Sequence, residues 1–185
     1  MKNKFLDNEL WILSIAGAFQ RAKIYAEHSP EKQRIAFRKR LRDKVLEIYE
    51  QYRSPVSEHQ HVNNIIDLIE CTKDDILIGG QLKFGSAQKL LNLFLKYEWC
   101  RGQIPEPPHC PVDRIVLSEV ERYKTESWTK MSGPVDYMRL VDSLRKKAVI
   151  ENMSLANWEL EVFNRRSNPI ASIEYDNLDA KTQHA

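Results

Sequence analysis

Two residues of opposite charge stand at predicted helix starts in the middle of the chain. Lys89 follows Phe84-Gly85-Ser86-Ala87-Gln88, and Asp113 follows Pro111-Val112. A lysine that is partly buried at the positive end of a helix dipole loses affinity for its proton, and a neutral amine is a nucleophile. The same dipole keeps a carboxylate at a helix start ionised. If the two side chains face a common cleft, they form a candidate nucleophilic centre.

A glycine-rich turn precedes the lysine. The segment from Gly79 to Ala87 holds three of the six glycines of the chain. A turn of this kind that runs into a helix presents free backbone N–H groups and the positive end of the helix dipole. Both features suit a phosphate group.

Together the two segments resemble the helix-hairpin-helix DNA glycosylases. The hairpin of that family reads approximately Pro-Gly-Val-Gly-Arg-Lys-Thr-Ala. Here Phe84-Gly85-Ser86-Ala87-Gln88-Lys89-Leu90-Leu91 keeps the first glycine and the lysine, and has Ala87 in place of the second glycine. The family's later Pro-Val-Asp-Thr-His-Val is similar to Pro111-Val112-Asp113-Arg114-Ile115-Val116, which lacks the Thr-His pair. The four-cysteine iron–sulfur signature typical of the family is absent.

The resemblance implies an all-α enzyme that binds double-stranded DNA and extrudes a damaged base from the stack. Lys89 would attack the sugar carbon as the glycosidic bond breaks, and the product would be a Schiff base from which strand scission could follow. Asp113 would stabilise the developing oxocarbenium ion or assist removal of a proton. The resemblance implies no cofactor.

The same resemblance implies a DNA-binding surface around the lysine. The backbone of Gly85, Ser86 and Ala87 would hold a phosphate. Separately from the resemblance, the polar neighbours of Trp128 make it a candidate for stacking on a base. Further positive charge on this face would come from three side chains, Lys83, Lys96 and Arg114.

Three of these residues also have a purely structural interpretation. Lys89 would then be a solvated helix residue, Asp113 an N-cap, and Trp128 a core anchor. No metal site is predicted. His109 and Cys110 are adjacent on an extended segment and therefore point apart, and His59 and His61 have no second pair of ligands.

Two other functions are consistent with the sequence. Arg21 and His28 lie seven positions apart in a predicted helix and resemble the Arg-x(4–6)-His motif of the HEPN ribonucleases. Alternatively, the chain is a non-catalytic helical interaction protein, an adaptor that binds a protein partner through an exposed apolar patch around Phe84, Phe94 and Trp99.

The elements that must position these residues are helices. Apolar residues recur with helical spacing, and Ser, Asp, Gly and Pro mark the helix ends. The fold class predicted is all-α, a bundle of about seven helices with a glycine-rich turn, a proline-rich connection and no significant sheet. The expected helices span 9–28, 31–53, 57–69, 86–101, 113–120, 134–150 and 154–164, and residues 104–111 hold four of the eight prolines.

Composition limits the class of protein. The chain has 185 residues, 28 Lys and Arg against 26 Asp and Glu, and 42% hydrophobic residues, which excludes a disordered chain, a fibrous repeat and a strongly charged tail. We expect one all-α domain over residues 1–166 and a flexible polar tail over 167–185. Three separated cysteines and the lack of a long apolar stretch favour a reducing compartment, no membrane span and a cytoplasmic location.

Overall fold

The computed structural model describes residues 3–167, which form helices joined by short loops. Strand pairing within these residues is limited to one isolated antiparallel bridge between Tyr25 and Leu77. The prediction of an all-α fold without a significant sheet is confirmed. The helices are α1 (Lys4–Phe19), α2 (Glu31–Tyr49), η1 (Glu50–Arg53), α3 (Glu58–Glu70), α4 (Phe84–Cys100), α5 (Arg114–Leu117), η2 (Glu121–Tyr123), η3 (Trp128–Lys130), α6 (Pro134–Ile150) and α7 (Leu155–Ser167).

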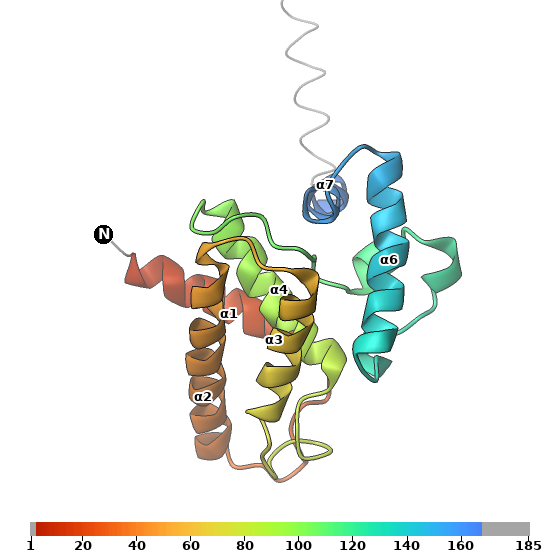
Figure 1. The fold of residues 1–185 in the computed structure, drawn as a ribbon. Helices are drawn as coiled ribbons and strands as arrows, with labels where there is room; N and C mark the ends of the chain where they lie inside the picture. Colours follow the sequence, from red (N-terminus) through yellow and green to blue (C-terminus); the bar gives the residue numbers. More distant parts are fainter. Residues whose placement is uncertain (1–2, 168–185) are drawn as a thin grey trace, which may run out of the picture.

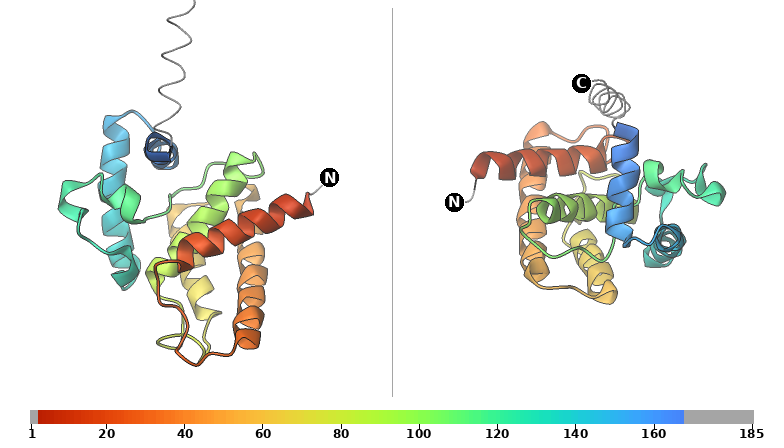
Figure 2. Two further views of the ribbon diagram at one scale, coloured as in Figure 1. Left: turned by 180° about the vertical axis from the view of Figure 1, so that it is seen from behind. Right: turned by 90° about the horizontal axis from the view of Figure 1, so that it is seen from above.

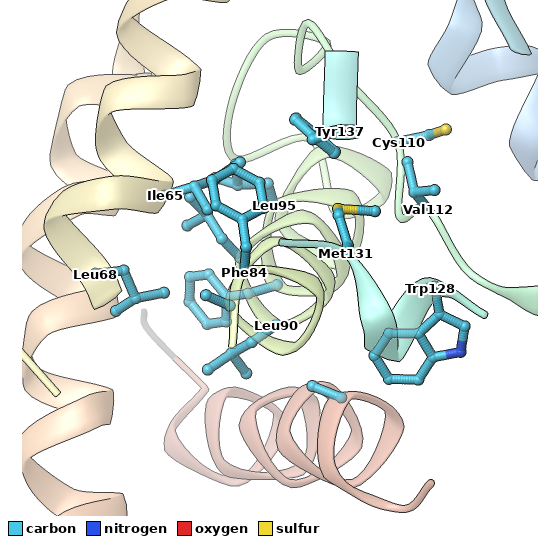
Figure 3. Packing of buried hydrophobic residues seen from close by; sticks show 14 of the residues in the cluster. Ile65, Leu68, Phe84, Leu90, Leu95, Cys110, Val112, Trp128, Met131 and Tyr137 are labelled. Atoms are coloured by element: carbon cyan, nitrogen blue, oxygen red, sulfur yellow. The ribbon is translucent and has the colours of Figure 1, made fainter. Parts of the chain in front are cut away.

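Helix α4 lies at the centre of the molecule. Helices α1, α2 and α3 pack around one part of it, and the segments from α5 to α7 lie on the other side (Figures 1 and 2). Most of its side chains are buried, and these include polar ones such as Gln88, Lys89 and Asn92. Ile65 and Leu68 of α3 lie on one side of α4, whereas Val112 and Trp128 lie on the other (Figure 3).

Several helix ends form where the sequence predicts them. The Ser57 hydroxyl accepts a hydrogen bond from the backbone N–H of Gln60, and the Ser154 hydroxyl accepts one from Asn157. Helix α6 spans the expected residues, with Pro134 in its first turn, where a missing N–H costs nothing. After α4, Gly102 adopts a positive φ of 70°, a conformation that glycine adopts readily.

The first helix is shorter at its C-terminal end than its apolar pattern predicts. It ends at Phe19, because the residues that follow pair with the loop before α4: the backbone N–H of Ala26 donates to Ile76, and that of Ile78 donates to Ile24. Arg21 and His28 therefore do not share a helix face, and the arrangement expected for a HEPN ribonuclease is wrong. Smaller differences occur elsewhere, since the α-helical part of 31–53 ends at Tyr49 and the helix expected from Ser86 begins at Phe84.

Two further predictions concern the C-terminal tail and a membrane-spanning helix. The sequence predicts the tail over residues 167–185. Its first residue, Ser167, is the last described residue of helix α7, and the rest of the predicted tail lies outside the described residues. Within residues 3–167, no helix combines the length and the apolar character that crossing a membrane would require.

Candidate functional site

The structure brings Lys89 and Asp113 together. The Nζ atom of Lys89 lies 3.1 Å from Oδ2 of Asp113. The side chains are 11% and 19% exposed, so the pair lies at the edge of the core and is not fully enclosed. Because α4 starts at Phe84, Lys89 occupies its second turn instead of the first.

Asp113 also has the structural role that the sequence allows. It is the N-cap of α5, and its Oδ1 atom accepts hydrogen bonds from the backbone N–H groups of Ile115, at 2.8 Å, and Val116, at 3.4 Å. The cap uses one carboxylate oxygen, and the other faces Lys89. The capping bonds therefore hold the carboxylate beside the amine.

Trp128 forms the third side of this site. Its ring centre lies 4.6 Å from Nζ of Lys89, which is a favourable distance for a cation–π contact. The residue is buried, and its backbone carbonyl lies against Gly85, where a Cβ atom would overlap it. In this arrangement Trp128 is a core anchor that covers the lysine, and its ring is not exposed for stacking on a base.

The backbone at the start of α4 is not accessible to solvent or to a ligand. Gly85, Ser86 and Ala87 are all buried, and the η3 segment lies against Gly85. The backbone cradle for a phosphate that the sequence predicts at these residues is therefore not accessible in this structure. The reason is the packing of residue 128 on the first turn of the helix, which the sequence does not reveal.

Of the three additional cations predicted on this face, two are exposed. Lys83 precedes α4, and Arg114 follows the Asp113 cap. Lys96 is buried instead, with Nζ 2.7 Å from a carboxylate oxygen of Glu159 and 4.6 Å from the ring centre of Phe163. The prediction that Lys96 is a surface cation for DNA is wrong, because α7 covers it.

An open pocket of about 750 Å³ lies beside the glycine-rich turn. The turn contributes Gly79 and Lys83 to its lining, and residues Thr129 and Lys130 line it from the η3 segment. The segment 128–131 thus separates this pocket from Lys89. Lys83 and Lys130 are both exposed, and the lining also includes the carboxylate of Glu70.

The described histidines do not form a metal site. Within residues 3–167, no group of three or more potential ligands has a geometry that could hold a metal ion. Burial lowers the pKa of His61 to about 3 and, together with repulsion from His61 and Arg145, lowers that of His109 to about 2, so both rings are neutral at pH 7. Cys110 is buried as well, and burial raises the pKa of its thiol, which leaves it a poor nucleophile.

The structure contains a buried polar network around α4 that the sequence analysis does not predict. The Tyr137 hydroxyl bonds Nδ1 of His109 at 3.0 Å and accepts from the Asn92 amide at 3.0 Å. Asn92 also donates to Oε1 of Gln88. The available signal is that Gln88 and Asn92 are uncharged polar residues one helical turn apart in a helix rich in Leu and Phe.

The apolar patch predicted for an interaction protein is absent. Phe84 and Phe94 are buried, and Trp99 is half-buried. Large apolar side chains are exposed elsewhere, on the outer face of α1, where Phe5, Ile12 and Leu13 are 71%, 53% and 50% exposed.

Comparison with known proteins yields no match. No family model, no curated protein and no solved structure is significantly similar to this chain.

Proposed function

We propose that this protein is a DNA base-excision glycosylase and lyase in which Lys89 is the nucleophile and Asp113 accepts its proton. The observation that carries the proposal is the 3.1 Å contact between Nζ of Lys89 and Oδ2 of Asp113 at the edge of the core. An amine held beside a carboxylate has the donor and acceptor needed for nucleophilic catalysis.

The proposed reaction uses only these two groups. Asp113 takes a proton from the Lys89 ammonium, and the neutral amine forms a bond to the sugar carbon C1′. The glycosidic C–N bond breaks, its electron pair leaves with the base, and the proton on Asp113 passes to the departing base. A proton of the attached Lys89 nitrogen passes to the ring oxygen as the C1′–O4′ bond breaks, which gives a Schiff base. Asp113 then takes a proton from C2′, the 3′ phosphate leaves with the electron pair of its C–O bond, and the strand is cleaved.

Access to the lysine requires a local movement. The Trp128 ring covers Nζ of Lys89, so a sugar can approach only when the η3 segment shifts away. In the proposal, the exposed side chains of Lys83 and Arg114 bind phosphates, while the buried backbone at the start of α4 does not.

A borohydride trapping experiment tests this function. Purified protein is incubated with duplex DNA that carries an abasic site or an oxidised base, and borohydride reduces any Schiff base to a stable adduct. We expect an adduct with the unmodified protein, none with Lys89→Gln, and an unchanged yield with Lys146→Gln, which removes an exposed lysine on α6. If the unmodified protein forms no adduct with any of the duplexes, the proposal is contradicted.

A non-catalytic interaction protein is the second candidate. The exposed Phe5, Ile12 and Leu13 of α1 favour it, because large apolar side chains gathered on one helix face often mark a partner surface. This candidate predicts no trapped adduct.

A further inference from the structure

The side chain of Gln88 is joined to the peptide backbone at Val112 by two hydrogen bonds. Nε2 of Gln88 donates to the Val112 carbonyl at 2.7 Å, and the Val112 N–H donates to Oε1 of Gln88 at 3.2 Å. The side-chain amide thus pairs with the backbone as one strand pairs with another. Both residues are completely buried.

The remaining hydrogen-bonding capacity of the amide is also used. Nε2 donates a second bond to the carbonyl of Gly85 at 3.0 Å, and Oε1 accepts a second bond from Asn92 at 3.2 Å. A glutamine amide has two donor hydrogens and two acceptor positions, so all four are occupied. The amide has one orientation, because a flip would place donors against donors.

Gln88 and Val112 directly precede the two residues of the candidate site. Lys89 is the next residue after Gln88 in α4, and Asp113 is the next after Val112. The paired amide and peptide therefore fix the register between α4 and the extended segment that carries Asp113. A shift of that segment would separate Asp113 from Lys89.

The same extended segment is held at a second point. His109, three residues before Val112, bonds the Tyr137 hydroxyl, which Asn92 also bonds. Pro111 lies between the two points and restricts the backbone there. The segment from 109 to 112 is consequently tied to α4 and α6 by buried hydrogen bonds.

We propose that Gln88 is a positioning residue that sets the contact between Lys89 and Asp113 through Val112. As a role in catalysis, this inference rests on the proposed function. As a statement about geometry, it is testable without any activity.

The first test measures the coupling between Lys89 and Asp113 by a double-mutant cycle in denaturant unfolding, with Lys89→Met and Asp113→Asn. Asparagine preserves the helix cap, so Asp113→Asn removes the charge alone. We expect the coupling to fall by more than half in a Gln88→Met background. It should be unchanged in a Leu144→Ala background, which removes a buried side chain of α6 and destabilises the fold in general.

If Gln88 contributes to stability alone, Gln88→Met will lower the free energy of unfolding and leave the coupling between Lys89 and Asp113 unchanged. That result would overturn the proposal, and so would the absence of coupling in the unmodified background, since there would be no pair to position.

The second test uses Gln88→Glu and covers the case in which Gln88→Met does not fold. A neutral carboxylic acid can donate one bond and accept another, so it can restore the pairing with Val112, whereas a carboxylate cannot donate. We expect the trapped-adduct yield of Gln88→Glu, relative to the unmodified protein at the same pH, to rise at least threefold between pH 8 and pH 5. A constant ratio would overturn the proposal. If the unmodified protein traps no adduct at all, the proposed function fails, and the unfolding cycle still decides the role of Gln88.

Discussion

The carbonyl group of Trp128 occupies the space where a side chain on Gly85 would begin. The atoms that a Cβ would meet belong to the backbone, which cannot rotate away as a flexible side chain can. This close approach brings η3 onto the first turn of α4 and places the Trp128 ring over Lys89. The glycine is thus required for packing between two segments.

Replacement of this glycine should be costly. We expect Gly85→Ser to lower the free energy of unfolding by about 1–3 kcal/mol, because η3 must move outward to make room. Gly133→Ser is the matched control, since nothing lies within 4 Å of a Cβ at that position. Its effect should stay within about 0.5 kcal/mol. Urea unfolding of both variants checks this, and equal effects would show that the contact at Gly85 is not tight.

The buried ion pair between Lys96 and Glu159 gives a second prediction. The two side chains are 9% and 6% exposed, so either one alone would be a buried charge without its partner. We expect Lys96→Met and Glu159→Met each to destabilise the protein by about 3–5 kcal/mol. The double variant should be markedly more stable than the sum of the two effects predicts. Additive effects in the unfolding cycle would mean that the pair contributes no coupling.

Stability should fall in mild acid. The pKa values of His61 and His109 drop from their usual 6.5 to about 3 and about 2 in the folded protein. Below pH 6.5 the unfolded chain takes up protons that the folded protein does not, so the free energy of unfolding falls as the pH falls. The loss starts near pH 6.5 and continues until the pH reaches the folded values.

Each histidine should contribute a slope of about 1.4 kcal/mol per pH unit within that window. Urea unfolding at a series of pH values from 7 to 5 measures the combined slope. His109→Gln should reduce it by about half. A stability that is independent of pH over this range would contradict the neutral, buried state of the two rings.

The sequence predicts the helices well where a local signal marks their ends. Ser57, Asp113 and Ser154 cap helices as their residue types indicate, and Pro134 begins one. The apolar pattern around residues 20–28 fails to predict a loop, because the competing hydrogen bonds come from Ile76 and Ile78, distant in the chain. Pairing of this kind leaves no trace in local periodicity.

For the candidate site, the residue types predict which side chains lie together, and they do not predict which side chains are exposed to solvent. The contact between Lys89 and Asp113 occurs as the sequence suggests. The burial of Gly85 and of Lys96 depends on η3 and α7, which pack on α4 from later in the chain. The sequence could not show which of the lysines along α4 those segments cover.

The two roles of Asp113 can be separated. Asparagine caps helices as well as aspartate does, whereas alanine does not. We expect Asp113→Ala to lower the free energy of unfolding by about 1 kcal/mol more than Asp113→Asn does. In the borohydride assay both variants should lose most of the adduct, because both lack the carboxylate beside Lys89. Full adduct formation by Asp113→Asn would assign the residue to capping alone.

The most direct measurement is the identity of the residue that becomes attached to DNA. The borohydride-reduced complex is digested with a protease and a nuclease, and mass spectrometry locates the remaining sugar fragment. The proposed function predicts the modification on the side-chain nitrogen of Lys89 and on no other amine. A modification at Lys83, at another lysine or at the N-terminal amine, or the absence of any covalent product, would contradict it.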